Sequence, residues 1–248
     1  MNLRRSITIL IGLLACVLMA FAGVNAKSQV SQFTPAQQQI LKSIVPAKII
    51  YLGEIHNSAT DHADQLAILE HLDQQKSPAN PRLAIGLEMF QKPYQPIINQ
   101  YLAGKISEEQ LVTQTEYQKR WGWPWENYAP LLQFAQAHQI PVIALNTPSE
   151  VLRKVSKGGI DSLQAADFQY IPPASTIDKS NLTYRDLILE SYRQHKAQAL
   201  ATSPDFDRFY TAQLLWDETM AATAAEFYQQ HPQTQLVVIA GQDRKSVV

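Results

Sequence analysis

Four short runs of apolar residues constrain the fold of this chain more than any other feature. They cover residues 47–52, 83–87, 142–145 and 235–240, and each is rich in Ile, Val or Leu. Their apolar character is continuous rather than alternating, which is typical of strands covered by helices on both faces. Segments with helical periodicity separate the runs. This order predicts an α/β fold with a largely parallel sheet covered by helices.

The second and third runs are joined by a long connection, residues 91–140, which predicts several helices. Ser107 and Gln110 form a capping-box pattern that starts one of them. The connection is rich in aromatic residues: Tyr94, Tyr101, Tyr117, Trp121, Trp123, Trp125 and Tyr128. Two interpretations stay open for this aromatic crossover. It is either a helical layer packed on the sheet or the flat apolar wall of a pocket, as a haem site requires.

Three further helices are predicted from their ends. One begins near Asp61, which we expect to cap it. Another begins at Thr147, with Thr147 as cap and Glu150 reaching back, and ends at Gly159. The third covers residues 205–230.

Polar residues follow the strands directly. Glu54 and His56 come after the first, Glu88 after the second and Asn146 after the third. The carboxyl ends of parallel strands share one rim, where ligands of such folds bind, so we expect these four residues to converge. Glu54, His56 and Glu88 could bind a divalent metal ion such as zinc or manganese, or move protons. Each carboxylate alone could instead cap a helix.

His62 lies six residues after His56, on the helix that follows the first strand. It is either a ligand at the same rim or an ordinary histidine of a helix, at the surface or partly buried. Both interpretations stay open.

The amino terminus has the features of an export signal, residues 1–26. Arg4 and Arg5 precede an apolar run over residues 7–24, and Ala26 ends a cleavage-site pattern. An uncleaved membrane anchor is one alternative. Lipidation of Cys16, the only cysteine, is another. We therefore expect an exported protein, either periplasmic or held on a membrane as a lipoprotein.

The charge balance excludes one class of partner. The 248 residues carry 21 Lys and Arg against 22 Asp and Glu, so no basic field attracts nucleic acid. The length suits one domain, residues 27–242.

The chain resembles the ChaN-like haem-binding uptake family, part of a wider group with the erythromycin esterases and Tiki-type proteins. The resemblance runs from Ile50 to Gly241 through the motifs YLGEIH, LEMF, WENY, ALN and QLLWDETMA. It implies a non-catalytic protein of iron uptake that binds haem at a surface or dimer interface. A tyrosine would then lie at the iron, for which Tyr117 and Tyr128 are the candidates. Implied partners are a second copy and a membrane haem receptor or transporter.

The wider group implies a rival function. Some of its members bind metal through paired Gly-x-x-His motifs and glutamates and hydrolyse bonds. Residues 53–56 supply one motif, so the alternative is a metal-dependent hydrolase using Glu54, His56 and Glu88. The second motif would follow the last strand, where residues 243–248, DRKSVV, stand instead. We interpret these six residues as a non-native tail and the domain as truncated at its carboxyl end.

Overall fold

The computed structural model describes residues 33–75, 82–195 and 204–242. The predicted export signal, with Cys16, and the predicted tail at 243–248 lie outside the described residues. Among the helices described, none has the length and apolar character needed to cross a membrane.

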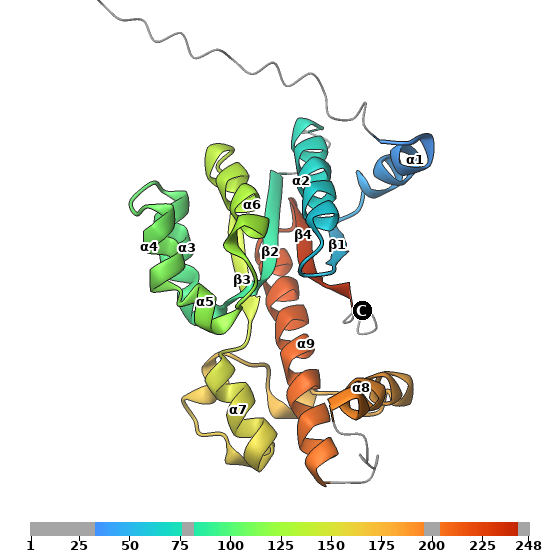
Figure 1. Ribbon diagram of the computed structural model, residues 1–248, viewed down its shortest axis with the longest axis vertical. Helices are drawn as coiled ribbons and strands as arrows, with labels where there is room; N and C mark the ends of the chain where they lie inside the picture. Colours follow the sequence, from blue (N-terminus) through green and yellow to red (C-terminus); the bar gives the residue numbers. More distant parts are fainter. Residues whose placement is uncertain (1–32, 76–81, 196–203, 243–248) are drawn as a thin grey trace, which may run out of the picture.

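The centre of the molecule is a four-stranded sheet, and all its strand pairs are parallel. Its strands are β1 (Ile49–Glu54), β2 (Arg82–Gln91), β3 (Val142–Asn146) and β4 (Thr234–Gly241). They are ordered β1-β4-β2-β3, so the last strand of the chain lies between the first two. The predicted α/β class and the four strand positions are confirmed. The strands point downward in Figure 1, and their carboxyl ends form the lower rim of the sheet.

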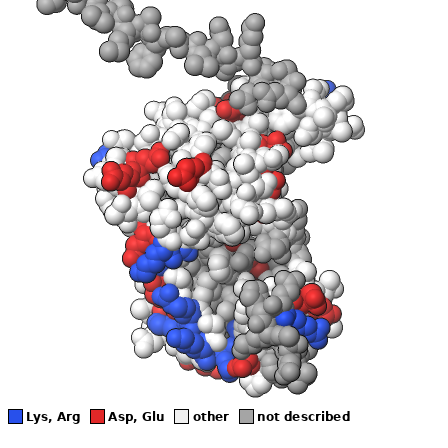
Figure 2. Space-filling view, in the orientation of Figure 1, with Lys and Arg blue, Asp and Glu red and all other residues white. Residues whose placement is uncertain are grey.

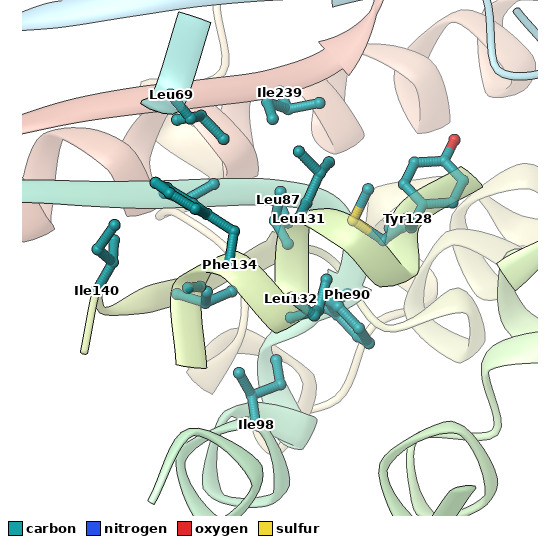
Figure 3. Close-up of a cluster of buried hydrophobic side chains, with 14 of the residues drawn as sticks. Leu69, Leu87, Phe90, Ile98, Tyr128, Leu131, Leu132, Phe134, Ile140 and Ile239 are labelled. Carbon is teal, nitrogen blue, oxygen red and sulfur yellow. The ribbon is translucent and has the colours of Figure 1, made fainter. Parts of the chain in front are cut away.

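One face of the sheet is covered by the helices of the crossover and by the helix after β1. These elements are α2 (Ala59–Gln74), η2 (Lys92–Tyr94), α3 (Gln95–Leu102), α4 (Glu108–Gln114), α5 (Tyr117–Arg120) and α6 (Trp125–Ala137). Their apolar side chains interlock with Leu87 and Ile239 from the strands in the largest hydrophobic cluster (Figure 3). The predicted capping box of α4 is present, because Ser107 Oγ accepts from Gln110 N while the Gln110 side chain accepts from Ser107 N.

The opposite face is covered by α9 (Pro204–Gln230). Its bounds agree with those of the helix predicted over residues 205–230. Met220 and Ala224 of α9 pack on Leu236 and Val238 of β4. A helix of 27 residues is about 40 Å long, so α9 extends well past the rim of the sheet. Its lower half packs against α7 (Ser149–Gly158) and α8 (Leu182–His195), which form a lower lobe (Figure 1).

Short elements complete the chain. Helix α1 (Pro35–Ile44) precedes β1, and three single turns, η3 (Ile160–Ser162), η4 (Asp167–Gln169) and η5 (Ala174–Thr176), connect α7 to α8. On the face shown in Figure 2, acidic side chains gather over the crossover helices and basic ones over the lower lobe. Acidic side chains also stand beside the basic ones of the lower lobe, so this face carries charges of both signs (Figure 2).

Two predicted helix caps are wrong. The cap of α2 is Ser58, whose hydroxyl accepts from Asp61 N. Asp61 lies in the first turn and accepts from Ile55 N at 2.7 Å, so it fixes the loop before the helix. Helix α7 has Pro148 in the cap position and no side-chain cap, because Thr147 lies one residue too early. Its predicted end is confirmed, since Gly159 follows with φ of 75°.

Candidate functional site

The centre of the candidate site is Glu54, the last residue of β1. The residue is only 2% exposed, and the side chains of Tyr128, His56 and Gln65 bond to its two carboxylate oxygens. Tyr128 Oη donates to Oε1 at 2.5 Å, and His56 Nδ1 lies 2.9 Å from the same oxygen. Gln65 Nε2 donates to Oε2 at 3.0 Å. The carboxylate thus joins β1, α2 and α6 at the rim of the sheet.

These hydrogen bonds keep Glu54 ionised in spite of its burial. Burial alone raises the pKa of a carboxyl group, but the bonds from His56, Tyr128 and Gln65 outweigh it and hold the pKa of Glu54 below its ordinary value. The pKa of Tyr128 is raised by burial and by its bond to Glu54. The site therefore contains a buried anion with a neutral tyrosine and an imidazole bound to one of its oxygens.

His56 connects this buried anion to the surface. Its side chain is 20% exposed, and the ring lies 4.8 Å from Trp121 and 5.3 Å from Trp123 between centroids. Trp123 is 36% exposed and Ile55, beside His56 in the chain, is 52% exposed. An imidazole oriented by a carboxylate thus lies in an accessible apolar surface.

His62 and Asn127 hold the loop that carries His56. His62 Nε2 lies 3.0 Å from the carbonyl oxygen of His56, and Asn127 Nδ2 donates to the same oxygen at 3.3 Å. His62 is buried, its Nδ1 lies 3.6 Å from Glu54 Oε2, and its ring packs on that of Tyr128. The structure thus gathers Glu54, His56, His62 and Tyr128 in one cluster.

Glu88 and Asn146 form a second cluster at the same rim. Glu88 Oε2 accepts from Gly241 N at 2.7 Å, and Asn146 Nδ2 donates to the carbonyl oxygen of Glu88 at 2.8 Å. Glu88 lies between Leu87 and Met89 in β2, and both of these side chains belong to the cluster on the face of the sheet that the crossover helices cover. Its side chain therefore lies on the α9 side of the sheet, opposite to that of Glu54.

The strand order separates the two clusters further. Strands β1 and β3 are the two edges, so Glu54 and Asn146 are three strand spacings apart, about 14 Å in the backbone. The expected common rim exists, but the four residues do not meet in one small pocket. Within residues 33–75, 82–195 and 204–242, no group of three or more His, Cys, Asp or Glu side chains is arranged to hold a metal ion.

The aromatic crossover is mostly core. Tyr101, Tyr117, Trp125 and Tyr128 are buried, and Tyr117 packs between Trp125 and Tyr128. The Tyr117 hydroxyl has no hydrogen-bond partner among the described residues. Trp121 and Trp123 lie beside His56, and Asn127 and Tyr128 of α6 also contact the candidate site. The interpretation as a helical layer packed on the sheet is therefore confirmed for the buried residues, and the interpretation as the wall of a haem pocket stays a prediction.

Sequence reasoning missed Gln65 and Asn127. Gln65 had a usable signal, because the buried stripe of α2 comprises His62, Gln65, Leu69 and Leu72, and two polar residues in an apolar stripe indicate a buried polar contact. Asn127 had no such signal. Its role depends on the position of a loop 71 residues away.

Comparison with known proteins assigns the chain to a family. Residues 40–243 match the family described as "Haem-binding uptake, Tiki superfamily, ChaN". The chain belongs to this family. The ChaN of Campylobacter jejuni, solved with cofacially bound haem, has the same fold, with a TM-score of 0.65 over 86% of this chain and 78% of that one at 18% identity.

Other likenesses were also found. An erythromycin esterase variant in its open conformation aligns with a TM-score of 0.48 at 13% identity, over 87% of this chain and 66% of that one. A curated relative of this ChaN-family chain is Protein RETICULATA-RELATED 5, chloroplastic, of Arabidopsis thaliana. It is 30% identical over 146 residues, which are 56% of this chain and 19% of the relative. The chain therefore spans about a fifth of that relative.

Proposed function

We propose that this protein binds haem for bacterial iron or haem uptake and has no catalytic activity of its own. The family description names haem-binding uptake, and the similar Campylobacter jejuni protein holds haem. The observation that carries the proposal in this chain is the surface around His56. It combines an imidazole, which can ligate haem iron, with the exposed indole of Trp123, which offers apolar surface to the macrocycle.

His56 is the residue that would hold the haem iron in this proposal. Neutral imidazole is a common ligand of haem iron, and ligating histidines commonly donate their other ring N–H to a carboxylate. His56 Nδ1 already makes this contact with Glu54, so Nε2 is the nitrogen that would bind iron. Trp123 and Ile55 supply apolar surface for the macrocycle. The residues present therefore fit the cofactor.

Tyr117 and Tyr128 fit the role of iron ligand less well. Tyr128 is 0% exposed and its hydroxyl is bound to Glu54, while Tyr117 lies behind it in the core. Either hydroxyl would have to leave the interior to reach haem at the surface. Both tyrosines are better explained as support for the site.

A hemin titration tests the proposal. Wild type should give a saturable Soret band, and His56→Ala should lose at least tenfold in affinity and change the band position. His231→Ala is the matched control, because His231 is exposed and lies directly after α9, where its Nδ1 is 3.1 Å from the carbonyl oxygen of Phe227 and its ring stacks on that of Phe227. Equal titrations of His56→Ala and His231→Ala would place the iron on another residue.

The proposal also includes the location of the protein in the cell and its partners. An exported or lipid-anchored protein could pass haem to a membrane receptor or transporter, and a second copy could cover an exposed haem face. Fractionation of cells that produce the full chain tests the location. Sedimentation with and without hemin tests whether a second copy associates on loading.

The second candidate is a metal-dependent hydrolase. The contact between Glu54 and His56 favours it, because a carboxylate that orients an imidazole is also what a general base requires. Glu88 would be the other participant, although its side chain lies on the far side of the sheet. Metal analysis of purified protein in parallel with the hemin titration separates the two. Tightly held zinc or manganese, lost in His56→Ala and Glu88→Ala and without a Soret shift, would favour the hydrolase.

A further inference from the structure

We propose that the protein forms a two-fold dimer through strand β1, whose open edge pairs with the same edge of a second copy and joins the two sheets into one. This inference goes beyond the proposed haem function and does not depend on it, because the contact needs no ligand. Strand β1 forms the right-hand edge of the sheet in Figure 1, and β4 is its only strand partner among the described residues.

The backbone of β1 carries a row of unpaired groups on its outer side. The carbonyl oxygen of Lys48, directly before the strand, accepts from Leu236 N of β4. Successive residues of a strand direct their N–H and C=O groups to opposite sides, so those of Ile49, Tyr51 and Gly53 face away from β4. Within the described part of the chain, no hydrogen bond reaches these outward groups. Such a row is a template for a further strand.

The other edge of the sheet, strand β3, is closed. Gln95 of α3 lies along it, where its Nε2 donates to the carbonyl oxygen of Val142 at 2.8 Å and its Oε1 accepts from Ala144 N at 2.7 Å. This amide side chain takes the place that the next strand would occupy. Because each molecule has one open edge, strand pairing must join like edge to like edge, and it ends at a dimer.

The sequence of β1 fits an antiparallel copy of itself. When Tyr51 lies opposite Tyr51 of the second copy, Ile49 lies opposite Gly53, and all three outward residues form hydrogen-bonded pairs. The strand and the residue before it carry only two charges, on Lys48 and Glu54. The same register places these two opposite each other at both ends of the pairing. Opposite charges are thus brought together and no like charges meet, as cross-strand pairs require.

Apolar side chains are exposed along the same edge. Ile40 of α1 is 59% exposed, Tyr51 is 45% exposed, and Ile55, directly after β1, is 52% exposed. A hollow of about 260 Å³ lies between α1, β1 and α2, lined mainly by apolar side chains such as Leu52 and Ile68. A strand added to β1 would cover this surface. The contact is only six residues long on each side, so we expect a reversible dimer.

Sedimentation of the purified haem-free protein tests the dimer, from about 1 µM to about 1 mM, the range in which weak reversible interfaces dissociate. Wild type should pass from monomer to dimer. Tyr51→Lys and Tyr51→Glu should each weaken the association by about tenfold or more, because two like charges then lie opposite each other. An equal mixture of the two variants should associate again, because a lysine then faces a glutamate. Phe168→Lys is the matched control, since Phe168 is 40% exposed on the lower lobe, and it should dimerise like wild type.

Hydrogen exchange in wild type gives a second readout that needs no variant. The Tyr51 amide should exchange slowly in concentrated protein and fast in dilute protein, while the Ile50 amide, which faces β4, should exchange slowly in both. A monomer at every concentration, a species larger than a dimer, or a dimer that the Tyr51 variants leave unchanged would overturn the inference. If the Tyr51 variants do not fold, the exchange comparison decides alone, and a Tyr51 rate independent of concentration overturns the inference. The hemin titration tests the haem proposal separately.

Discussion

At the scale of single residues, Glu54 shows how a buried charge is held in this fold. An unpaired buried carboxylate would destabilise the folded state by several kcal/mol. Glu54 instead receives hydrogen bonds from Tyr128, His56 and Gln65, which keep its pKa low. These donors come from the loop after β1, from α2 and from α6. The residue that could serve function also ties three elements of the fold together.

The two buried tyrosines should differ in their contribution to folding. Tyr128→Phe removes a bond to a charged group, so we expect it to lower the free energy of unfolding by about 1.5–3 kcal/mol. Tyr117→Phe removes a buried hydroxyl that has no partner in the described residues, and it should be neutral or slightly stabilising. Urea unfolding of the haem-free proteins measures both. Equal losses would show that Tyr128 contributes only packing.

Part of the candidate site could be predicted from the sequence. Glu54 and His56 were found because they follow an apolar strand, and His62 because it lies on the next helix. The role of Tyr128 could not be derived this way, since its partner is 74 residues distant and its face of α6 depends on how the crossover packs. The sequence also did not reveal that Glu88 and Glu54 lie on opposite faces of the sheet. In a strand buried on both faces, apolar and polar residues do not alternate, so the pattern does not show which face a side chain is on.

At the scale of elements, Arg120 joins the crossover to the lower lobe. Its guanidinium contacts Glu116 on one side, and Gln91 at the end of β2 and Glu150 of α7 on the other. It also lies over the ring of Tyr94 at 5.0 Å. Glu116 has φ of 50°, unusual for a residue other than glycine or asparagine, so its carboxylate contacts help to hold a strained turn before α5.

This tie predicts a dependence of stability on pH. Bonds from Lys119, Tyr94 and Arg120 lower the pKa of Glu116 from 4.5 to about 2. A pKa that is lower in the folded state means that the stabilisation is complete above pH 4.5 and is lost as the pH falls toward 2. Glu116→Gln should therefore unfold at lower urea than wild type at pH 7, and the two midpoints should approach each other below pH 4.5. A constant gap down to pH 3 would contradict this.

Close packing of the sheet gives another prediction. A Cβ atom added at Gly86, in β2, would lie 2.9 Å from Leu145 Cδ1 of the neighbouring strand. Leu145 belongs to the cluster that α9 covers, so it has little room to move. Gly86→Ala should destabilise the protein by about 1–3 kcal/mol. Chemical denaturation measures this, and Leu145→Ala in the same chain should recover part of the loss if the contact is its cause.

The elements themselves were more predictable than their arrangement. Continuous apolar runs located all four strands, and the cap at Ser107 was correct because both halves of the pattern are local. The caps at Asp61 and Thr147 were wrong because a neighbouring residue took the position. The insertion of β4 between β1 and β2 depends on long-range pairing, which a single sequence does not reveal.

At the scale of the whole molecule, α9 links the layers. Its upper half covers the sheet through Met220 and Ala224, and its lower half carries the lobe through Leu214 and Leu215. The rim at the carboxyl ends of the strands lies at the level where the sheet ends and the lobe begins (Figure 1), and His56 follows β1 there by two residues. Three elements around that rim are already fixed by Glu54, so the site is formed largely before any ligand binds.

Because the site is formed before the ligand binds, ligand binding should raise the free energy of unfolding of the whole protein. A ligand that binds only the folded state, at a free concentration one hundred times its dissociation constant, stabilises that state by about 2.7 kcal/mol. We expect hemin to raise the unfolding midpoint of wild type and of Tyr117→Phe accordingly. His56→Ala should gain much less at the same hemin concentration, because the iron would lose its ligand. Thermal and urea unfolding with and without hemin measure this difference, and His231→Ala shows the effect of losing a surface imidazole. If His56→Ala were stabilised as much as wild type, hemin would be bound elsewhere, and the rim at β1 would have to be abandoned as its site.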